Sequence, residues 1–180
     1  MIKYLAVTLA LMVVIGVWWF FPPVNGVEKY TDITISMSGE TVHLVDGVGE
    51  TERMMGESGK TTVRYFGNDA IVDFDRDGRD DVVFLVTQET GGSGTFFYLV
   101  GGRNTTSGYV GTAVVLIGDR IAPQTTEARP DGTIIVNYAD RAPGEPFTTQ
   151  PSVGKSLYLK YDTASNSFGE LVQNFEGEER

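Results

Sequence analysis

The chain has 180 residues, and its 24 acidic and 14 basic side chains give a formal net charge of −10 at neutral pH. An acidic balance of this size argues against nucleic-acid binding through a basic patch. The chain has no cysteine and a single histidine, His43. It therefore has no disulfide, no lipidated cysteine and no Cys/His ligand set for zinc.

The N-terminal segment is strongly apolar. Tyr4 to Phe21 contains no charged residue, and a helix of that length, about 27 Å, nearly matches the hydrocarbon core of a bilayer. Lys3 precedes this segment and the aromatic run Trp18–Phe21 ends it, which favours an N-terminus inside the cell and an exported remainder. We expect a single-pass transmembrane anchor over residues 1–24 that places the protein in the cell membrane. A cleaved signal peptide is the alternative.

Residues 27–173 are predicted to form one exported domain, followed by a polar tail over residues 174–180. Helical periodicity is nearly absent, and short apolar or alternating runs recur between Gly, Pro, Asn and Asp. The expected strands are 31–36, 41–45, 61–66, 70–74, 82–87, 95–100, 109–117, 125–129, 133–138, 156–161 and 170–173. We expect a loose connection at residues 46–60. The predicted fold is all-β, an antiparallel sandwich or a partly open barrel.

The most informative motif is Asp-Phe-Asp-Arg-Asp-Gly-Arg-Asp-Asp at residues 73–81. Carboxylates at Asp73, Asp75, Asp77 and Asp81 fall at positions 1, 3, 5 and 9 of a loop, and the backbone carbonyl of Arg79 falls at position 7. This spacing suits Ca²⁺, which takes six to eight oxygen ligands. The sequence predicts one structural Ca²⁺ here, with a solvated acidic turn as the alternative.

The residues that flank this loop exclude an EF-hand. Position 12 is Phe84 rather than a bidentate glutamate. The flanking runs at residues 70–72 and 82–86 are rich in β-branched and aromatic residues, which predicts strand–loop–strand.

Phe66-Gly67 followed by Val72–Val82 resembles an FG-GAP-type repeat, the calcium-loop unit of integrin-like β-propellers. The resemblance implies calcium at Asp73, Asp75, Asp77 and Asp81, but no second copy of the motif supports a propeller. The stretch from Tyr65 to Tyr161 also resembles an uncharacterised family of membrane-anchored bacterial proteins. This second resemblance implies an envelope location and no particular activity.

The segment from Ala139 to Lys155 is long for a connection within a compact domain. Arg141, Glu145 and Phe147 are candidates for a recognition surface on it, with an envelope protein or a glycan as the expected partner. The alternative is a proline-stiffened loop that packs on the sheet edge and blunts it.

No catalytic constellation stands out. His43 lies in an alternating run typical of a surface strand, and Ser152-Val153-Gly154-Lys155 lacks the helix and the companion motif of a Ser-x-x-Lys enzyme. The sequence favours a non-catalytic binding module of the cell envelope. A hydrolase acting on envelope polymers and an inhibitor of an envelope enzyme remain the alternatives.

Overall fold

A computed structural model describes residues 29–52 and 60–172. The predicted membrane anchor and the predicted polar tail lie outside the described residues, so both stay predictions. The all-β prediction is confirmed, since every regular element within the described ranges is a strand. The strands are β1 Thr34–Met37, β2 Glu40–His43, β3 Val48–Glu52, β4 Lys60–Val72, β5 Asp81–Glu89, β6 Thr95–Thr105, β7 Gly108–Gly111, β8 Val115–Asp119, β9 Ala122–Ala128, β10 Thr133–Asp140, β11 Val153–Asp162 and β12 Ser167–Glu170.

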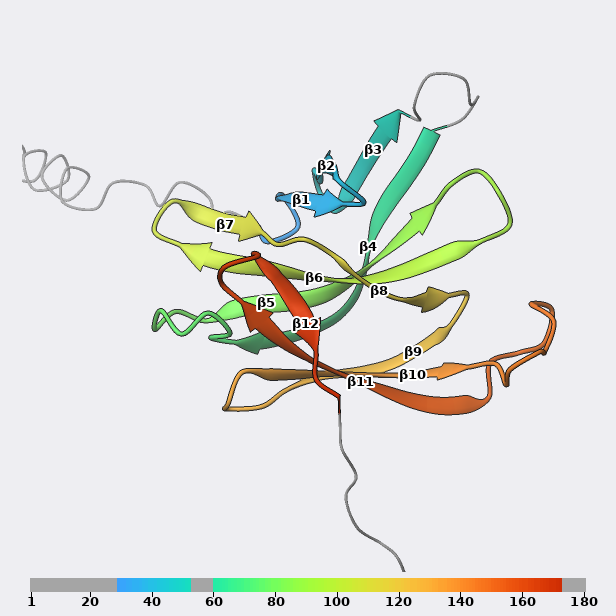
Figure 1. Ribbon diagram of the computed structural model, residues 1–180. Coiled ribbons are helices and arrows are strands. Elements are labelled where there is room, and N and C mark those ends of the chain that lie inside the picture. The colour runs from blue at the N-terminus through green and yellow to red at the C-terminus, as the bar shows by residue number, and fades with distance from the viewer. Residues whose placement is uncertain (1–28, 53–59, 173–180) are drawn as a thin grey trace, which may run out of the picture.

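The strands form three antiparallel sheets (Figure 1). The central sheet has the order β3-β4-β5-β6-β7, and β8 pairs with β6 further along that strand. A four-stranded sheet, β12-β11-β10-β9, faces one side of the central sheet, and the β1–β2 hairpin covers the other side. The central sheet is strongly twisted and curled (Figure 1).

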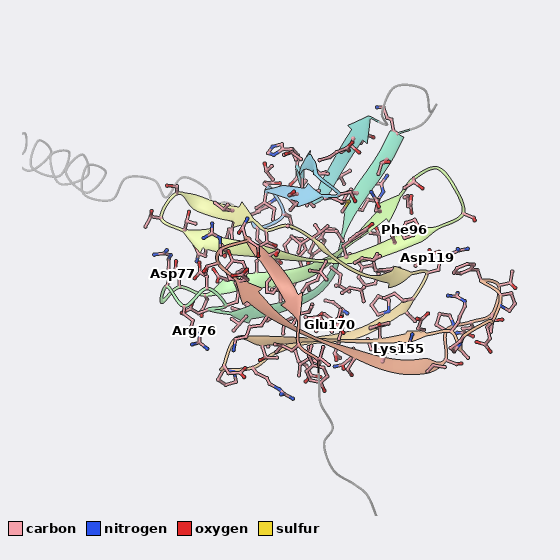
Figure 2. All side chains as sticks on the ribbon, viewed as in Figure 1. Arg76, Asp77, Phe96, Asp119, Lys155 and Glu170 are labelled. Atoms are coloured by element: carbon pink, nitrogen blue, oxygen red, sulfur yellow. The ribbon has the colours of Figure 1, made fainter. Side chains whose placement is uncertain are left out.

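β5 explains why the central sheet is covered on both faces. Its residues 81–86 are all buried, and alternate side chains enter different cores because successive strand residues point to opposite faces. Val83 and Leu85 join the core shared with the four-stranded sheet. Val82 and Phe84 join the core under the β1–β2 hairpin. Figure 2 shows the side chains that fill the space between these layers.

The predicted connection at residues 46–60 is wrong in part, because β3 lies within it and pairs with the start of β4. The sequence of β3, Val-Gly-Glu-Thr-Glu, has little intrinsic strand propensity. Gly49 is required by close packing: a Cβ there would lie 2.7 Å from Val42 Cγ1 and 2.8 Å from the His43 carbonyl oxygen. Tertiary contacts, rather than local propensity, therefore make this segment a strand.

Three further predicted strand assignments differ from the structure. The segments predicted at 61–66 and 70–74 form one long strand, β4, with an irregular register around Gly67 and Asn68, both at positive φ. The strand predicted at 109–117 is divided into β7 and β8. Between them, Thr112 is fully buried and its hydroxyl accepts a hydrogen bond from the Gly101 amide at 3.0 Å. The last strand, β12, lies a few residues before the predicted 170–173.

Within the described ranges, no helix is long and apolar enough to cross a membrane. The apolar segment from Tyr4 to Phe21 is not among these residues.

Candidate metal centre

The predicted calcium loop joins β4 to β5, as the strand–loop–strand pattern requires. One carboxylate oxygen from each of Asp73, Asp75 and Asp81 lies within 4.8 Å of the other two. The structure thus brings together three of the four acidic residues that the sequence proposes as ligands.

The backbone of the loop wraps around Asp73. One of its carboxylate oxygens accepts a hydrogen bond from the Asp77 backbone amide at 3.0 Å, and the other accepts one from the Gly78 backbone amide at 2.9 Å. Arg76 and Gly78 adopt positive φ angles of 64° and 89°, which turn the chain back toward β5. Glycine adopts such an angle without steric cost, which explains the residue type at position 78.

Asp81 is the most buried member of the group, with 1% of its surface exposed. Its Oδ2 accepts the Phe74 amide at 3.1 Å, and its Oδ1 accepts the Asn104 amide from β6 at 2.8 Å. Burial raises the pKa of Asp81 to about 6, although the hydrogen bond from Asn104 acts in the opposite direction. Desolvation of the carboxylate thus outweighs its amide donors, and a bound cation would offset that cost.

Asp75 has a basic neighbour. Its Oδ2 lies 3.6 Å from Nη1 of Arg103, and only 8% of the Asp75 side chain is exposed. The Nε of Arg103 is buried and has no hydrogen-bond partner among the described residues. This loosely held guanidinium neutralises part of the cluster, so a metal ion would share Asp75 with it.

Asp77 does not join the cluster. Its carboxylate forms an ion pair with the guanidinium of Arg79, and Arg79 Nε donates to the Asn104 carbonyl oxygen at 2.6 Å. The role of Asp77 as a ligand and the role of the Arg79 carbonyl both remain predictions.

The outer turn of the loop is tied to two neighbouring hairpins. Arg76 and Asp77 lie at its tip (Figure 2). Arg76 donates to the Asp131 carbonyl oxygen in the β9–β10 turn at 2.9 Å. On the other side, Asn104 Nδ2 donates to the Asp80 carbonyl oxygen at 3.1 Å. Contacts from both sides therefore preorganise the cluster.

The predicted recognition loop lies between β10 and β11. The side chains of two of its three candidate residues, Arg141 and Glu145, form hydrogen bonds that hold the loop in place. Arg141 donates to the Thr149 carbonyl oxygen at 2.6 Å and to the Arg120 carbonyl oxygen at 2.9 Å. The Glu145 carboxylate accepts the Ala142 amide at 2.9 Å.

Phe147, the third candidate, is 58% exposed. The guanidinium of Arg120 stacks over its ring at 3.8 Å. Phe147 is therefore the member of the three that leaves apolar surface exposed.

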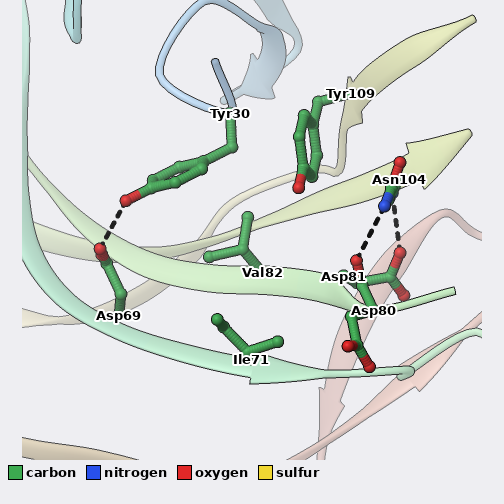
Figure 3. A pocket seen from close by; sticks show the side chains of 8 residues that line it. All are labelled: Tyr30, Asp69, Ile71, Asp80, Asp81, Val82, Asn104 and Tyr109. Carbon is green, nitrogen blue, oxygen red and sulfur yellow. Dashed lines mark hydrogen bonds between the residues drawn. The ribbon is translucent and has the colours of Figure 1, made fainter. Parts of the chain in front are cut away.

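A cavity of about 240 Å³ beside the calcium loop was not predicted from the sequence. Its lining residues are Tyr30, Asp69, Ile71, Asp80, Asp81, Val82, Asn104 and Tyr109 (Figure 3). No spacing signal links these residues, because they come from four separate segments of the chain. Asp69 is the one lining carboxylate that comes from outside residues 73–81.

His43 is exposed, as predicted, and its Nδ1 lies 2.9 Å from the Thr34 hydroxyl. Lys155 forms an ion pair with Asp140 at 2.7 Å, and the strand β11 runs through the Ser-x-x-Lys segment. The His43 contact is a cross-strand pair of the β1–β2 hairpin, and the partner of Lys155 is a carboxylate rather than a hydroxyl.

No family model, no curated protein and no solved structure matches the chain. The resemblances to the FG-GAP repeat and to a family of membrane-anchored proteins therefore remain predictions.

Proposed function

We propose that the protein is a membrane-anchored, extracytoplasmic β domain that binds one structural Ca²⁺ through Asp73, Asp75 and Asp81. The observation that carries the proposal is the convergence of these three carboxylates within 4.8 Å. The task of the domain is non-catalytic binding at the cell envelope, to a protein or a glycan.

The ligand chemistry supports calcium. All three side chains offer oxygen atoms, which Ca²⁺ prefers, and the described part of the chain supplies no imidazole or thiol to this cluster. Three carboxylates confined to this volume repel one another. A divalent cation would remove that repulsion and join the end of β4 to the start of β5, so its binding would stabilise the fold.

A binding role is favoured over catalysis by the cavity beside the loop. Asp69 is the cavity carboxylate that comes from outside the loop. Its Oδ2 accepts hydrogen bonds from the hydroxyls of Tyr30 and Tyr65, each at 2.7 Å. One oxygen of Asp69 thus serves two tyrosine hydroxyls, and backbone amides occupy both oxygens of Asp81. Apart from the exposed Asp80, the carboxylates of the cavity are thus committed to structural hydrogen bonds, which favours a binding role over acid–base catalysis.

The test is thermal unfolding of the full chain in a nonionic detergent, first with calcium and then with a chelator. At about a hundredfold excess over the dissociation constant, calcium should stabilise the fold by about 2.7 kcal/mol, which raises the melting temperature by several degrees. Asp75→Asn should abolish most of this rise.

Asp80→Asn is the matched control. It removes one negative charge from the adjacent surface, because Asp80 is exposed and outside the three-residue cluster. This variant should keep the calcium-dependent rise. Equal responses from both variants, or no response from the wild type, would refute the calcium site.

Membrane anchorage is tested separately, by protease treatment of intact and permeabilised cells that express the chain with a C-terminal tag. We expect the tag to stay with the membrane fraction and to be accessible from outside the cytoplasm. A tag that resists protease in spheroplasts would contradict the proposed location. So would a tag that is found in the soluble fraction.

A further inference from the structure

The cavity beside the calcium loop has acidic ends and an apolar middle (Figure 3). Asp69 lies at one end, and Asp80 and Asp81 lie at the other. Between them stand Val82, which is buried, and Ile71, which is 70% exposed. At about 240 Å³, the cavity is smaller than the pockets of about 300 to 1,000 Å³ that hold drug-sized ligands, so it suits a short, narrow molecule.

The charges of the cavity select a cation. None of the described residues that line it is basic. Both tyrosine hydroxyls that contact Asp69 donate to Oδ2, which leaves Oδ1 without a hydrogen bond to the described residues. The hydrogen bond to Asp69 raises the pKa of Tyr30, so this tyrosine stays a neutral donor.

Two aromatic rings form one long wall of the cavity. Tyr30 and Tyr109 meet edge to face, with ring centroids 6.0 Å apart, and both stand over Val82 (Figure 3). The Tyr109 hydroxyl makes no hydrogen bond to the described residues, and it points toward the cavity floor (Figure 3). Aromatic faces attract ammonium groups and also accept an aliphatic chain.

From these features we infer that the cavity is a binding site for a short aliphatic diamine, whose ammonium groups face Asp69 and Asp80 while its methylene chain lies against Ile71 and the tyrosine rings. This site goes beyond the proposed calcium function. The two sites share only Asp81. Asp81 is buried, so in the diamine site it forms part of the wall and is not a charge partner of the ligand.

The test is an NMR titration of the full chain in nonionic detergent and saturating calcium, with 1,4-diaminobutane as the probe. We expect saturable shifts that are confined to the residues lining the cavity. n-Butylamine, with one charge, should bind at least threefold more weakly. The neutral isostere 1,4-butanediol should cause no saturable shift.

Two conservative substitutions remove the proposed charge partners. Asp69→Asn keeps an acceptor oxygen for the tyrosine hydroxyls, and Asp80→Asn changes a side chain that makes no hydrogen bond to the described residues. Each should raise the dissociation constant of the diamine by about fivefold, which corresponds to the loss of one partly exposed ion pair. Glu89→Gln, an exposed acid at the far end of β5, is the matched control and should bind as the wild type does.

The aromatic wall is tested by a second pair of variants. Tyr109→Leu should weaken the diamine by at least about threefold, whereas Tyr109→Phe keeps the ring and should bind normally. Asp75→Asn should leave diamine binding intact, so that this site and the calcium site fail independently. The inference is overturned if butanediol shifts the same residues, if neither Asp69→Asn nor Asp80→Asn weakens the diamine, or if Asp75→Asn abolishes its binding.

Discussion

The backbone amide of Asn104 on β6 donates to the buried carboxylate of Asp81 at 2.8 Å. The side-chain amide of the same residue donates to the Asp80 carbonyl oxygen at 3.1 Å. One residue of a neighbouring strand therefore fixes both the deepest ligand of the candidate metal centre and the backbone that leads into it. These hydrogen bonds form without a metal, and ligands that are already held in position would bind a metal more tightly.

The first prediction concerns that side-chain contact. Asn104→Ala should lower stability by about 1 kcal/mol, because it removes one hydrogen bond and leaves the Asp80 carbonyl oxygen without its donor. The loss should appear with chelator and be no smaller with calcium, since the contact exists without the metal and also positions the backbone next to Asp81. The measurement is urea unfolding in both conditions, with Thr106→Ala, an exposed change in the same hairpin, as the control. A loss seen only in calcium would contradict the argument.

The second prediction concerns close packing between β6 and β12. A Cβ added to Gly101 would lie 2.8 Å from Phe168 Cε2 and 3.0 Å from Phe74 Cζ, and both rings belong to the core. Gly101→Ala should therefore destabilise the fold by about 1–3 kcal/mol. Gly169→Ala, also in a strand, meets nothing within 4 Å and should change stability by less than about 0.5 kcal/mol. Equal unfolding midpoints for the two variants would show that β6 and β12 are not packed as closely as the structure has them.

The third prediction tests burial of the central strand. Leu85 on β5 is completely buried between the central and four-stranded sheets. Leu85→Ala should cost about 2–5 kcal/mol, from lost transfer energy and the cavity that remains. Leu116→Ala on β8, where the side chain is 53% exposed, should cost far less. Denaturant unfolding of both variants measures the difference, and a small loss at Leu85 would argue against β5 as the centre of the fold.

The fourth prediction is a pH dependence at Asp119. Hydrogen bonds from the Arg120 guanidinium hold the pKa of Asp119 below its ordinary value of 3.8, despite partial burial. Because the folded pKa is lowered, the ionised carboxylate stabilises the fold fully above that ordinary value. The contribution is lost as pH falls through the lower, folded pKa.

Asp119→Asn should accordingly melt below the wild type at neutral pH, and the two melting temperatures should converge as the pH falls through the lowered, folded pKa of Asp119. A gap that stays constant over this range would mean that the Asp119 charge does not contribute to stability.

The sequence predicts the parts of this structure that rest on local patterns. The continuous apolar run of β5 and the alternating acids of residues 73–81 each carry their own signal. Strand β3 could not be predicted, because its five residues become a strand only through pairing with β4 and close packing of Gly49 on Val42. The cavity carries no sequence signal either, since Tyr30 and Tyr109 meet only after the central sheet has formed.

Asp77 shows where spacing and geometry separate. The repeat of acids at alternate positions assigns Asp77 the same role as Asp73 and Asp75. Its carboxylate instead pairs with Arg79, two residues later, while the other two converge with Asp81. Spacing along the chain reports which carboxylates can reach a centre, and the side-chain contacts within the folded loop decide which of them do.

Counting the bound metal ions tests whether Asp73, Asp75 and Asp81 hold one Ca²⁺. The full chain is dialysed to equilibrium against calcium, and the excess calcium on the protein side is measured by atomic emission. We predict one ion per wild-type chain, one in Asp80→Asn and none in Asp75→Asn. A wild-type chain that retains no calcium, or an Asp75→Asn chain that retains as much as the wild type, would contradict the account.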